Sequence, residues 1–227
     1  MAKIVVVKDL RSSFGPVRDQ GQRPTCLAFA VSDAHAALRK PWKPLSCEFV
    51  FYHAQRRAGR EPTRPALLSS VLTTLRLDGQ PIETDWPYLD DLPADLGDYG
   101  PPSGLSVFRR NGEAKSDKLG GVVAQLDAGL PAVVLLFLSD AFYEPDRNGV
   151  VHERPGETPD PARAHAVIAV GHARIGGKRA ILIRNSWGDE WGIDGYGWLS
   201  EDFLAPRLRR TVVLEEEVHV PGKNLAA

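Results

Sequence analysis

Hydrophobic and polar positions alternate with a helical period through the first half of the chain. Between residues 26 and 40 the apolar side chains recur three and four positions apart until Pro41 ends the run, and they are Ala28, Phe29, Val31, Ala34, Ala37 and Leu38. The same period predicts helices over residues 47–57, opened by Ser46 and followed by Gly59, and over residues 65–78. Residues 80–111 are rich in Pro, Gly and Asp and are expected to form ordered loop.

Short apolar runs replace the helical period in the second half. After a helix over residues 118–128, the run 131–138 predicts a buried strand, and a proline-rich surface connection follows over residues 144–163. Further strands are expected over residues 165–171, 180–185, 195–199 and 210–215, with an N-terminal strand over residues 4–7. Helices first and strands later predict an α+β protein with two unlike lobes.

Composition and charge exclude several classes of function. The 227 residues are 43% hydrophobic and 25% charged, as expected of a globular domain. Lys plus Arg number 28 and Asp plus Glu 29, so the net charge of −1 argues against a nucleic-acid partner. The apolar runs are too short for a membrane span or a secretory leader, and two cysteines make no disulfide framework. We expect a cytoplasmic protein.

Cys26 is the first candidate for chemistry. It stands at the predicted start of a helix, where the helix dipole favours a thiolate, and Thr25 occupies the N-cap position. A cysteine in such a place is more often an inert buried residue. The residue alone therefore leaves both interpretations open.

Downstream motifs change that balance. His165 opens the run His-Ala-Val-Ile-Ala-Val-Gly 139 residues after Cys26, and Asn185 begins Asn-Ser-Trp-Gly 159 residues after it. Together with Gln20-Gly21 ahead of the cysteine, these segments resemble the papain-like cysteine peptidases, the C1-type family. The landmarks Pro44-Leu45-Ser46 and Asp85-Trp86-Pro87-Tyr88 extend the resemblance over nearly the whole chain.

The resemblance implies a papain-like fold with the active site in a cleft between two lobes. We expect one domain over residues 1–227, with a helical lobe over about residues 10–110 and a β-rich, barrel-like lobe over residues 111–216. The N-terminal strand is expected to join the β-rich lobe.

The resemblance also implies a role for each motif residue. Cys26 would attack a peptide carbonyl, and His165 would pair with the thiolate and then protonate the leaving amine. Asn185 would orient the imidazole, and Gln20 with the Cys26 amide would form an oxyanion hole. Trp187 would cover the hydrogen bond between His165 and Asn185.

Substrate contacts follow from the same resemblance. Leu135, Ala166 and Trp187 are expected to bind a peptide or protein substrate, with an apolar preference at Leu135 for the side chain next to the cleaved residue. The sequence contains no His-Glu-x-x-His, paired Cys-x-x-Cys, Walker or Rossmann pattern. We therefore expect neither a metal nor an organic cofactor.

The chain departs from the family at several positions. Arg23 stands where the family has a disulfide-forming cysteine, so we expect no disulfide and a helical lobe held by packing alone. Pro24, Thr25 and Leu27 flank the nucleophile, with Leu27 packing between the lobes, and residues 59–66 lack the glycine pair that lines the substrate backbone. We also expect no pro-segment. The proteolytic activity would then be restrained by narrow specificity, by a regulatory partner protein or by an imperfect cleft.

The sequence thus predicts a thiol-dependent endopeptidase with a Cys-His-Asn triad and an acyl-enzyme intermediate. Two alternatives stay open. A peptide ligase or isopeptidase would use the same acyl-enzyme with another acceptor, and a pseudo-enzyme would use the cleft only to bind peptides or a partner protein. The four chemical positions are all filled, which favours an enzyme.

Overall fold

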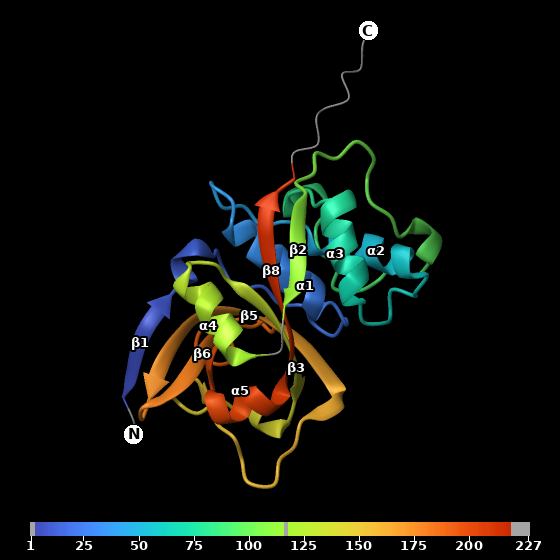
Figure 1. The fold of residues 1–227 in the computed structure, drawn as a ribbon. Helices are drawn as coiled ribbons and strands as arrows, with labels where there is room; N and C mark the ends of the chain where they lie inside the picture. Colours follow the sequence, from blue (N-terminus) through green and yellow to red (C-terminus); the bar gives the residue numbers. More distant parts are fainter. Residues whose placement is uncertain (1–2, 116–117, 219–227) are drawn as a thin grey trace.

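Three helices gather on one side of the molecule in the computed structural model, which describes residues 3–115 and 118–218 (Figure 1). They are α1 (Cys26–Ala37), α2 (Cys47–Ala58) and α3 (Leu68–Leu77). The Ser46 hydroxyl caps α2 by accepting a hydrogen bond from the Phe49 amide, and Gly59 ends the helix in the left-handed conformation (φ 60°). Ser46 and Gly59 thus behave as the sequence predicts.

The start of α1 has a different cap from the predicted one. Thr25 makes no side-chain capping bond, and its hydroxyl instead contacts the Tyr88 hydroxyl at 3.0 Å. Every residue of α1 after Cys26 is buried, so packing rather than capping holds this helix.

A single sheet forms the other side, with the strand order β2-β8-β3-β5-β6-β7-β4 and β1 paired to β5. The strands are β1 (Ile4–Asp9), β2 (Arg110–Lys115), β3 (Ala132–Leu138), β4 (Val150–Val151), β5 (Asp160–Ile175), β6 (Lys178–Arg184), β7 (Tyr196–Ser200) and β8 (Leu208–Glu217). β5 is central because its first half pairs with β3 and its second half with β1 and β6. All pairs except β4 with β7 are antiparallel. The α+β prediction is confirmed.

Two more helices and four short 3₁₀ turns complete the described structure. α4 (Leu119–Asp127) and α5 (Glu201–Arg207) lie beside the sheet (Figure 1), and the turns cover Arg11–Ser13, Glu83–Asp85, Leu96–Asp98 and Asp140–Tyr143. Among the described residues no helix is both long and apolar enough to cross a lipid bilayer.

The structure corrects one sequence-based expectation about elements and adds two elements that the sequence did not predict. Residues 144–163 are not one surface connection, because β4 pairs within the core against β7 and β5 already begins at Asp160. α5 lies between two predicted strands, in a stretch for which the sequence analysis gave no element, and the Ser200 hydroxyl caps it by accepting from the Phe203 amide. β2 has a polar sequence that carries no strand signal, and it forms because β8 pairs with it.

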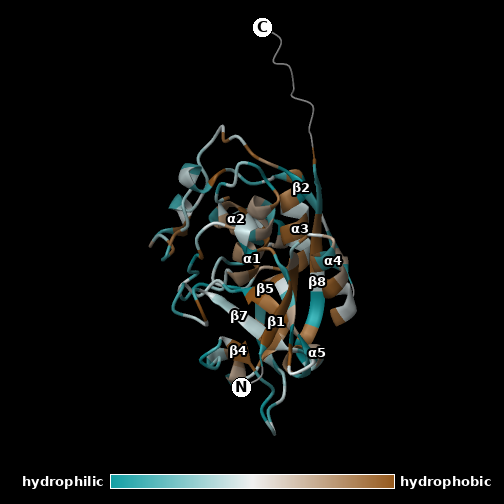
Figure 2. Ribbon diagram, turned by 90° about the vertical axis from the view of Figure 1, so that its left-hand side faces the viewer, coloured by the Kyte–Doolittle hydropathy of each residue, from teal (hydrophilic) through white to brown (hydrophobic). Residues whose placement is uncertain are grey.

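A hydrophobic core joins the helices to the sheet. Leu27 and Phe29 of α1 pack in the same cluster as Val133 of β3 and Ile168 of β5. Figure 2 shows hydrophobic residues along α1, α3 and β5 and hydrophilic residues in the surrounding loops. The prediction that Leu27 packs between the lobes is confirmed, and the start of α1 is thereby fixed against β5.

Candidate active site

His165 and Asn185 form the most direct side-chain contact among the predicted site residues. The Nε2 atom of His165 lies 2.8 Å from Oδ1 of Asn185, and both side chains are buried. His165 lies on β5, opposite Leu136 of β3, and Asn185 follows the last residue of β6. Since β5 and β6 are paired neighbours, the sheet itself brings the two motifs together.

A second hydrogen bond determines the protonation of the imidazole. The backbone N–H of Ser186 donates to the same Oδ1 of Asn185 at 2.9 Å. An atom that accepts from a backbone N–H is an oxygen, so it also accepts from His165, whose Nε2 must carry a proton. In the neutral ring Nδ1 is therefore left with a free electron pair.

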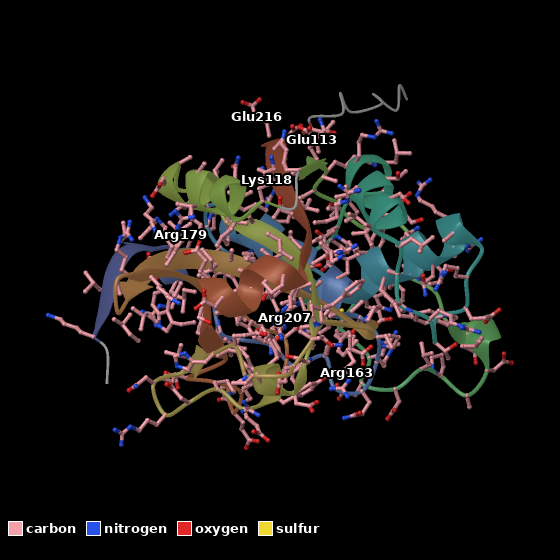
Figure 3. The ribbon with its side chains drawn as sticks, turned by 60° about the horizontal axis from the view of Figure 1, so that its bottom comes forward. Glu113, Lys118, Arg163, Arg179, Arg207 and Glu216 are labelled. Carbon is pink, nitrogen blue, oxygen red and sulfur yellow. The ribbon has the colours of Figure 1, made fainter. Side chains whose placement is uncertain are left out.

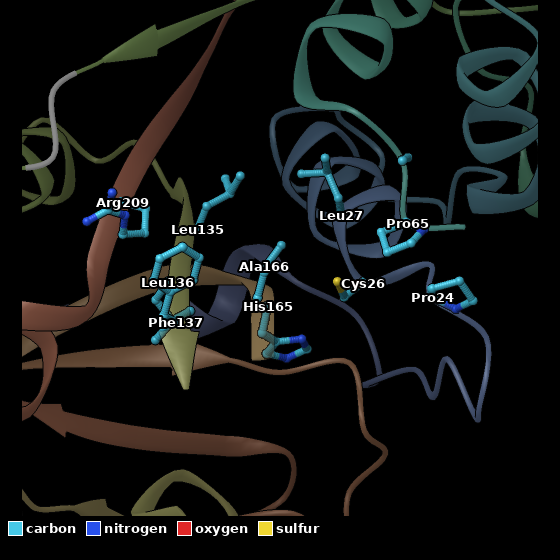
Figure 4. Close-up of a pocket in the computed structure, with 12 residues that line it drawn as sticks. Pro24, Cys26, Leu27, Pro65, Leu135, Leu136, Phe137, His165, Ala166 and Arg209 are labelled. Atoms are coloured by element: carbon cyan, nitrogen blue, oxygen red, sulfur yellow. The ribbon is translucent and has the colours of Figure 1, made fainter. Parts of the chain in front are cut away.

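Cys26 lies across a pocket from His165 (Figure 4). It is the first residue of α1 and the partly exposed one of the two free cysteines, whereas Cys47 is fully buried. Backbone hydrogen bonds involving Ala166 and Leu27 act on the Cys26 thiol. The thiol is thus held between the start of α1 and the backbone of β5.

Burial shifts the pKa values of both groups toward their neutral forms. Desolvation raises the pKa of the Cys26 thiol, and the backbone hydrogen bonds partly offset this effect. Desolvation also lowers the pKa of His165 to about 4, against an opposing contribution from the hydrogen bond to Asn185. Taken one at a time, thiol and imidazole are neutral at pH 7.

Gln20 is tied to the Asn185 segment on the other wall. Its Oε1 accepts from the Ser186 hydroxyl at 2.7 Å, and its backbone N–H donates to the Ser186 carbonyl at 2.9 Å. Its Nε2 donates to the Arg23 carbonyl at 2.8 Å, which uses one of two amide protons. The Tyr88 hydroxyl, 2.7 Å from the Gln20 carbonyl, holds the loop from the helical side. Ser186 and Tyr88 are positioning residues that the sequence analysis did not assign.

Aromatic rings cover the contact between His165 and Asn185. Trp187 lies over the imidazole with ring centres 4.7 Å apart, as the sequence predicted for this residue. Tyr143 stacks on Trp187 at 5.3 Å, and Phe142 contacts His165 edge-on at 5.7 Å. No motif in the sequence marks Tyr143, an exposed aromatic residue at the end of the 3₁₀ turn Asp140–Tyr143.

The pocket next to Cys26 has a volume of about 150 Å³ and mainly apolar walls. Leu135 and Ala166, both predicted as substrate-binding residues, line it together with Leu27, Leu136, Phe137 and Ala164. Pro24 and Pro65 contribute the wall on the helical side (Figure 4). Leu135 pairs with Ala166 across β3 and β5, which explains why the two residues face the same space.

Arg23 forms a buried ion pair inside the helical lobe, where the sequence predicted stabilisation by packing alone. Its guanidinium donates to both carboxylate oxygens of Glu48 at 2.6 and 2.8 Å and to the Leu89 carbonyl at 2.6 Å. Glu48 is fully buried, and Tyr99 also donates to it. The prediction that packing alone holds this lobe was wrong, because a sequence pattern does not reveal which two charges meet in the interior.

The remaining histidines lie in other surroundings. His35 bonds to Gln80 at 2.9 Å, and burial lowers its pKa to about 3. His172 pairs with Asp127 at 2.8 Å. Within residues 3–115 and 118–218, no three histidine, cysteine or acidic side chains are grouped so as to hold a metal ion.

Comparison with known proteins gives the same family. Residues 111–213, which include His165 and Asn185, match the sequence profile of the "Papain family cysteine protease". Cysteine proteinase 2 of Entamoeba histolytica is 26% identical over 190 residues, covering 80% of this chain and 58% of the relative. Cathepsin K of Gallus gallus is 28% identical over 202 residues, covering 82% of this chain and 55% of the relative.

The chain is similar to the papain-like cysteine peptidases over most of its length. It spans a little over half the length of these curated relatives. Solved structures agree on the fold of this papain-like chain. Xylellain, a cysteine protease from Xylella fastidiosa, superposes with a TM-score of 0.73 at 23% identity, covering 92% of this chain and 85% of that one. A Carica candamarcensis cysteine protease gives a TM-score of 0.68 at 21% identity, with 91% and 96% covered.

Proposed function

We propose that this papain-like chain hydrolyses internal peptide bonds through Cys26, His165 and Asn185, with an acyl-enzyme intermediate. One observation carries the proposal. The Ser186 amide and His165 Nε2 share Oδ1 of Asn185, which leaves Nδ1 of His165 as the free base beside the pocket that Cys26 lines. The similarity to papain-like cysteine peptidases supports peptidase chemistry.

The first step forms a thioester. The sulfur of Cys26 bonds to the carbonyl carbon of the scissile peptide while its proton passes to Nδ1 of His165. The carbonyl oxygen becomes an oxyanion, which accepts hydrogen bonds from the Cys26 amide and from the second Nε2 proton of Gln20. The carbon–nitrogen bond then breaks, and His165 returns its proton to the leaving amine.

The second step regenerates the enzyme. A water molecule gives a proton to His165 and attacks the thioester carbon, and the carbon–sulfur bond breaks. The proton returns to the Cys26 sulfur, so that both side chains are neutral again. No metal or organic cofactor takes part in this sequence.

The pKa directions define how the proton moves. Burial opposes a thiolate and an imidazolium when either forms alone. When the proton passes directly from Cys26 to His165, both charges form together and attract each other across the pocket. The predicted ion pair between the Cys26 thiolate and the His165 imidazolium therefore forms in the reacting complex, where substrate displaces water. Asn185 stabilises the imidazolium through its hydrogen bond to His165.

Two controls separate hydrolysis from the alternatives. The wild type, Cys26→Ala and Cys47→Ala are treated with a thiol-directed epoxide and given an internally quenched peptide library. We expect one label and turnover in the wild type and in Cys47→Ala, and neither in Cys26→Ala. Turnover by Cys26→Ala would contradict the proposal.

The products of the same experiment distinguish acceptors. A new peptide bond to an added amine, with little hydrolysis, would identify a ligase. An unlabelled wild type without turnover would identify a peptide-binding pseudo-enzyme.

A further inference from the structure

The pocket beside Cys26 contains one permanent charge, and that charge is positive. Its lining residues include Arg209 of β8 and no aspartate or glutamate. The other walls are apolar, apart from Cys26 and His165 themselves. A side chain that enters this pocket therefore meets apolar surface first and a guanidinium group at the far wall, where Figure 4 places Arg209 beyond Leu135 and Phe137.

An irregularity in the sheet brings Arg209 to this wall. Leu135 of β3 pairs with Arg210 of β8, but the next residue, Leu136, pairs with Leu208. Arg209 is the extra residue between them and has no partner opposite it on β3. Such a bulge redirects a side chain out of the regular alternation of the strand.

Arg209 also differs from Arg207 and Arg163 in its electrostatic partners. Arg207, two residues earlier, is buried and paired with Glu153, and Arg163 pairs with Asp140 at 2.5 Å (both arginines are labelled in Figure 3). Arg209 is exposed, and its guanidinium lies 4.9 Å from the centre of the Phe137 ring. In the part of the chain that the structure describes, no carboxylate lies within ion-pair distance of Arg209.

We propose that this pocket selects a glutamate side chain in the substrate, at the residue next to the cleaved one. The inference rests on the proposed peptidase function and names its substrate class. The two methylene groups of glutamate would pack against Leu135 and Phe137, and the carboxylate would pair with the Arg209 guanidinium, which the ring of Phe137 holds from one side. The structure thus adds a charge to the purely apolar preference that the sequence predicts.

Paired substrates test this proposal. Two quenched peptides differ only in glutamate or leucine at the position before the cleaved residue, and kcat/KM is measured for each with the wild type and with Arg209→Ala. We expect the wild type to prefer glutamate and Arg209→Ala to lower the glutamate-to-leucine ratio about fivefold, the value for one accessible ion pair. The preference should weaken at high salt.

Two further variants keep the test specific. Arg209→Glu should invert the preference and favour a lysine peptide over the glutamate peptide. Arg210→Ala removes the same charge from the adjacent residue, which does not line the pocket, and should leave the ratio unchanged. A wild type that prefers leucine, or equal changes in the ratio from Arg209→Ala and Arg210→Ala, would overturn the proposal.

A binding measurement distinguishes this inference from the peptidase function. The same peptides are titrated into Cys26→Ala, which retains Arg209 and lacks the nucleophile. We expect Cys26→Ala to bind the glutamate peptide more tightly than the leucine peptide, and the double variant Cys26→Ala, Arg209→Ala to lose this preference. That result would support the pocket assignment even if the wild type cleaved neither peptide. Equal binding of both peptides would reject the assignment even if both were cleaved.

Discussion

Arg184 and Asp33 form a buried ion pair that joins the two sides of the candidate active site. Nε of Arg184 donates to Oδ2 of Asp33 at 2.8 Å, with side-chain exposures of 1% and 7%. Arg184 immediately precedes Asn185, and Asp33 lies on α1, two turns after Cys26. Arg18 also pairs with Asp33 at 2.5 Å, so one carboxylate neutralises two guanidinium groups. This contact fixes the end of β6 against α1, the helix that begins at Cys26.

Removing the carboxylate should destabilise the protein strongly. Asp33→Asn leaves Arg184 in the interior without its counter-charge and leaves Arg18 paired with Glu83 alone. Breaking one partner of a buried pair costs about 3–5 kcal/mol. Chemical unfolding at pH 7 measures this loss. Arg57→Ala, which breaks the more accessible pair with Asp78, should cost less than about 1 kcal/mol. Equal losses from the two variants would show that the Asp33 pair has no special role.

Gln20→Ala should lower kcat more than it raises KM. The variant removes the side-chain donor proposed for the oxyanion, and loss of one such donor commonly costs about 10²–10³-fold in kcat. Gln22→Ala, an exposed residue in the same loop, is the matched control and should change kcat less than twofold. Steady-state kinetics on one peptide measures both constants, and an unchanged kcat for Gln20→Ala would remove Gln20 from the mechanism.

A plot of kcat/KM against pH should be bell-shaped. His165 must be neutral to accept the thiol proton, so kcat/KM should fall as the pH drops through its pKa of about 4. The alkaline limb reflects loss of the proton that Cys26 and His165 share, and burial, which raises the pKa of Cys26, should move this limb above the ordinary thiol range.

Substitution of Asn185 should move the acid limb in a predictable direction. The hydrogen bond from His165 to Asn185 favours the imidazolium, so Asn185→Ala should lower the pKa of His165 and shift the limb to lower pH. Asn185→Asp adds a negative charge and should shift it to higher pH. Profiles of kcat/KM for the three proteins check the order, and movement of both variants in one direction would contradict the assignment.

The stability of the helical lobe should not depend on reductant, because an ion pair and not a disulfide is formed at Arg23. Both cysteines are free thiols, and the position where the family resemblance implies a cystine half is an arginine in a buried ion pair. The melting temperature should therefore be equal with and without reductant, whereas Glu48→Gln should lower it by several degrees. A drop on reduction of the wild type would instead reveal a bridge between Cys26 and Cys47.

Local patterns in the sequence were sufficient to predict α1 to α4 and to single out the residues proposed to react. Ser46 and Gly59 mark the ends of α2 because capping depends on the residues within one turn. The motifs at Gln20, Cys26 and Asn185 are contiguous and specific, so they were recognisable before any contact was known.

Only the tertiary structure decided the features that depend on contacts between distant segments. β2 is a strand because β8 pairs with it, and Arg23 is neutralised because Glu48 meets it in the interior. Arg209 faces the pocket because one residue of β8 has no partner on β3, and the burial that shifts the pKa of His165 comes from rings far away in the chain. Such properties depend on register, burial and charge pairing, which arise only when the whole chain is packed.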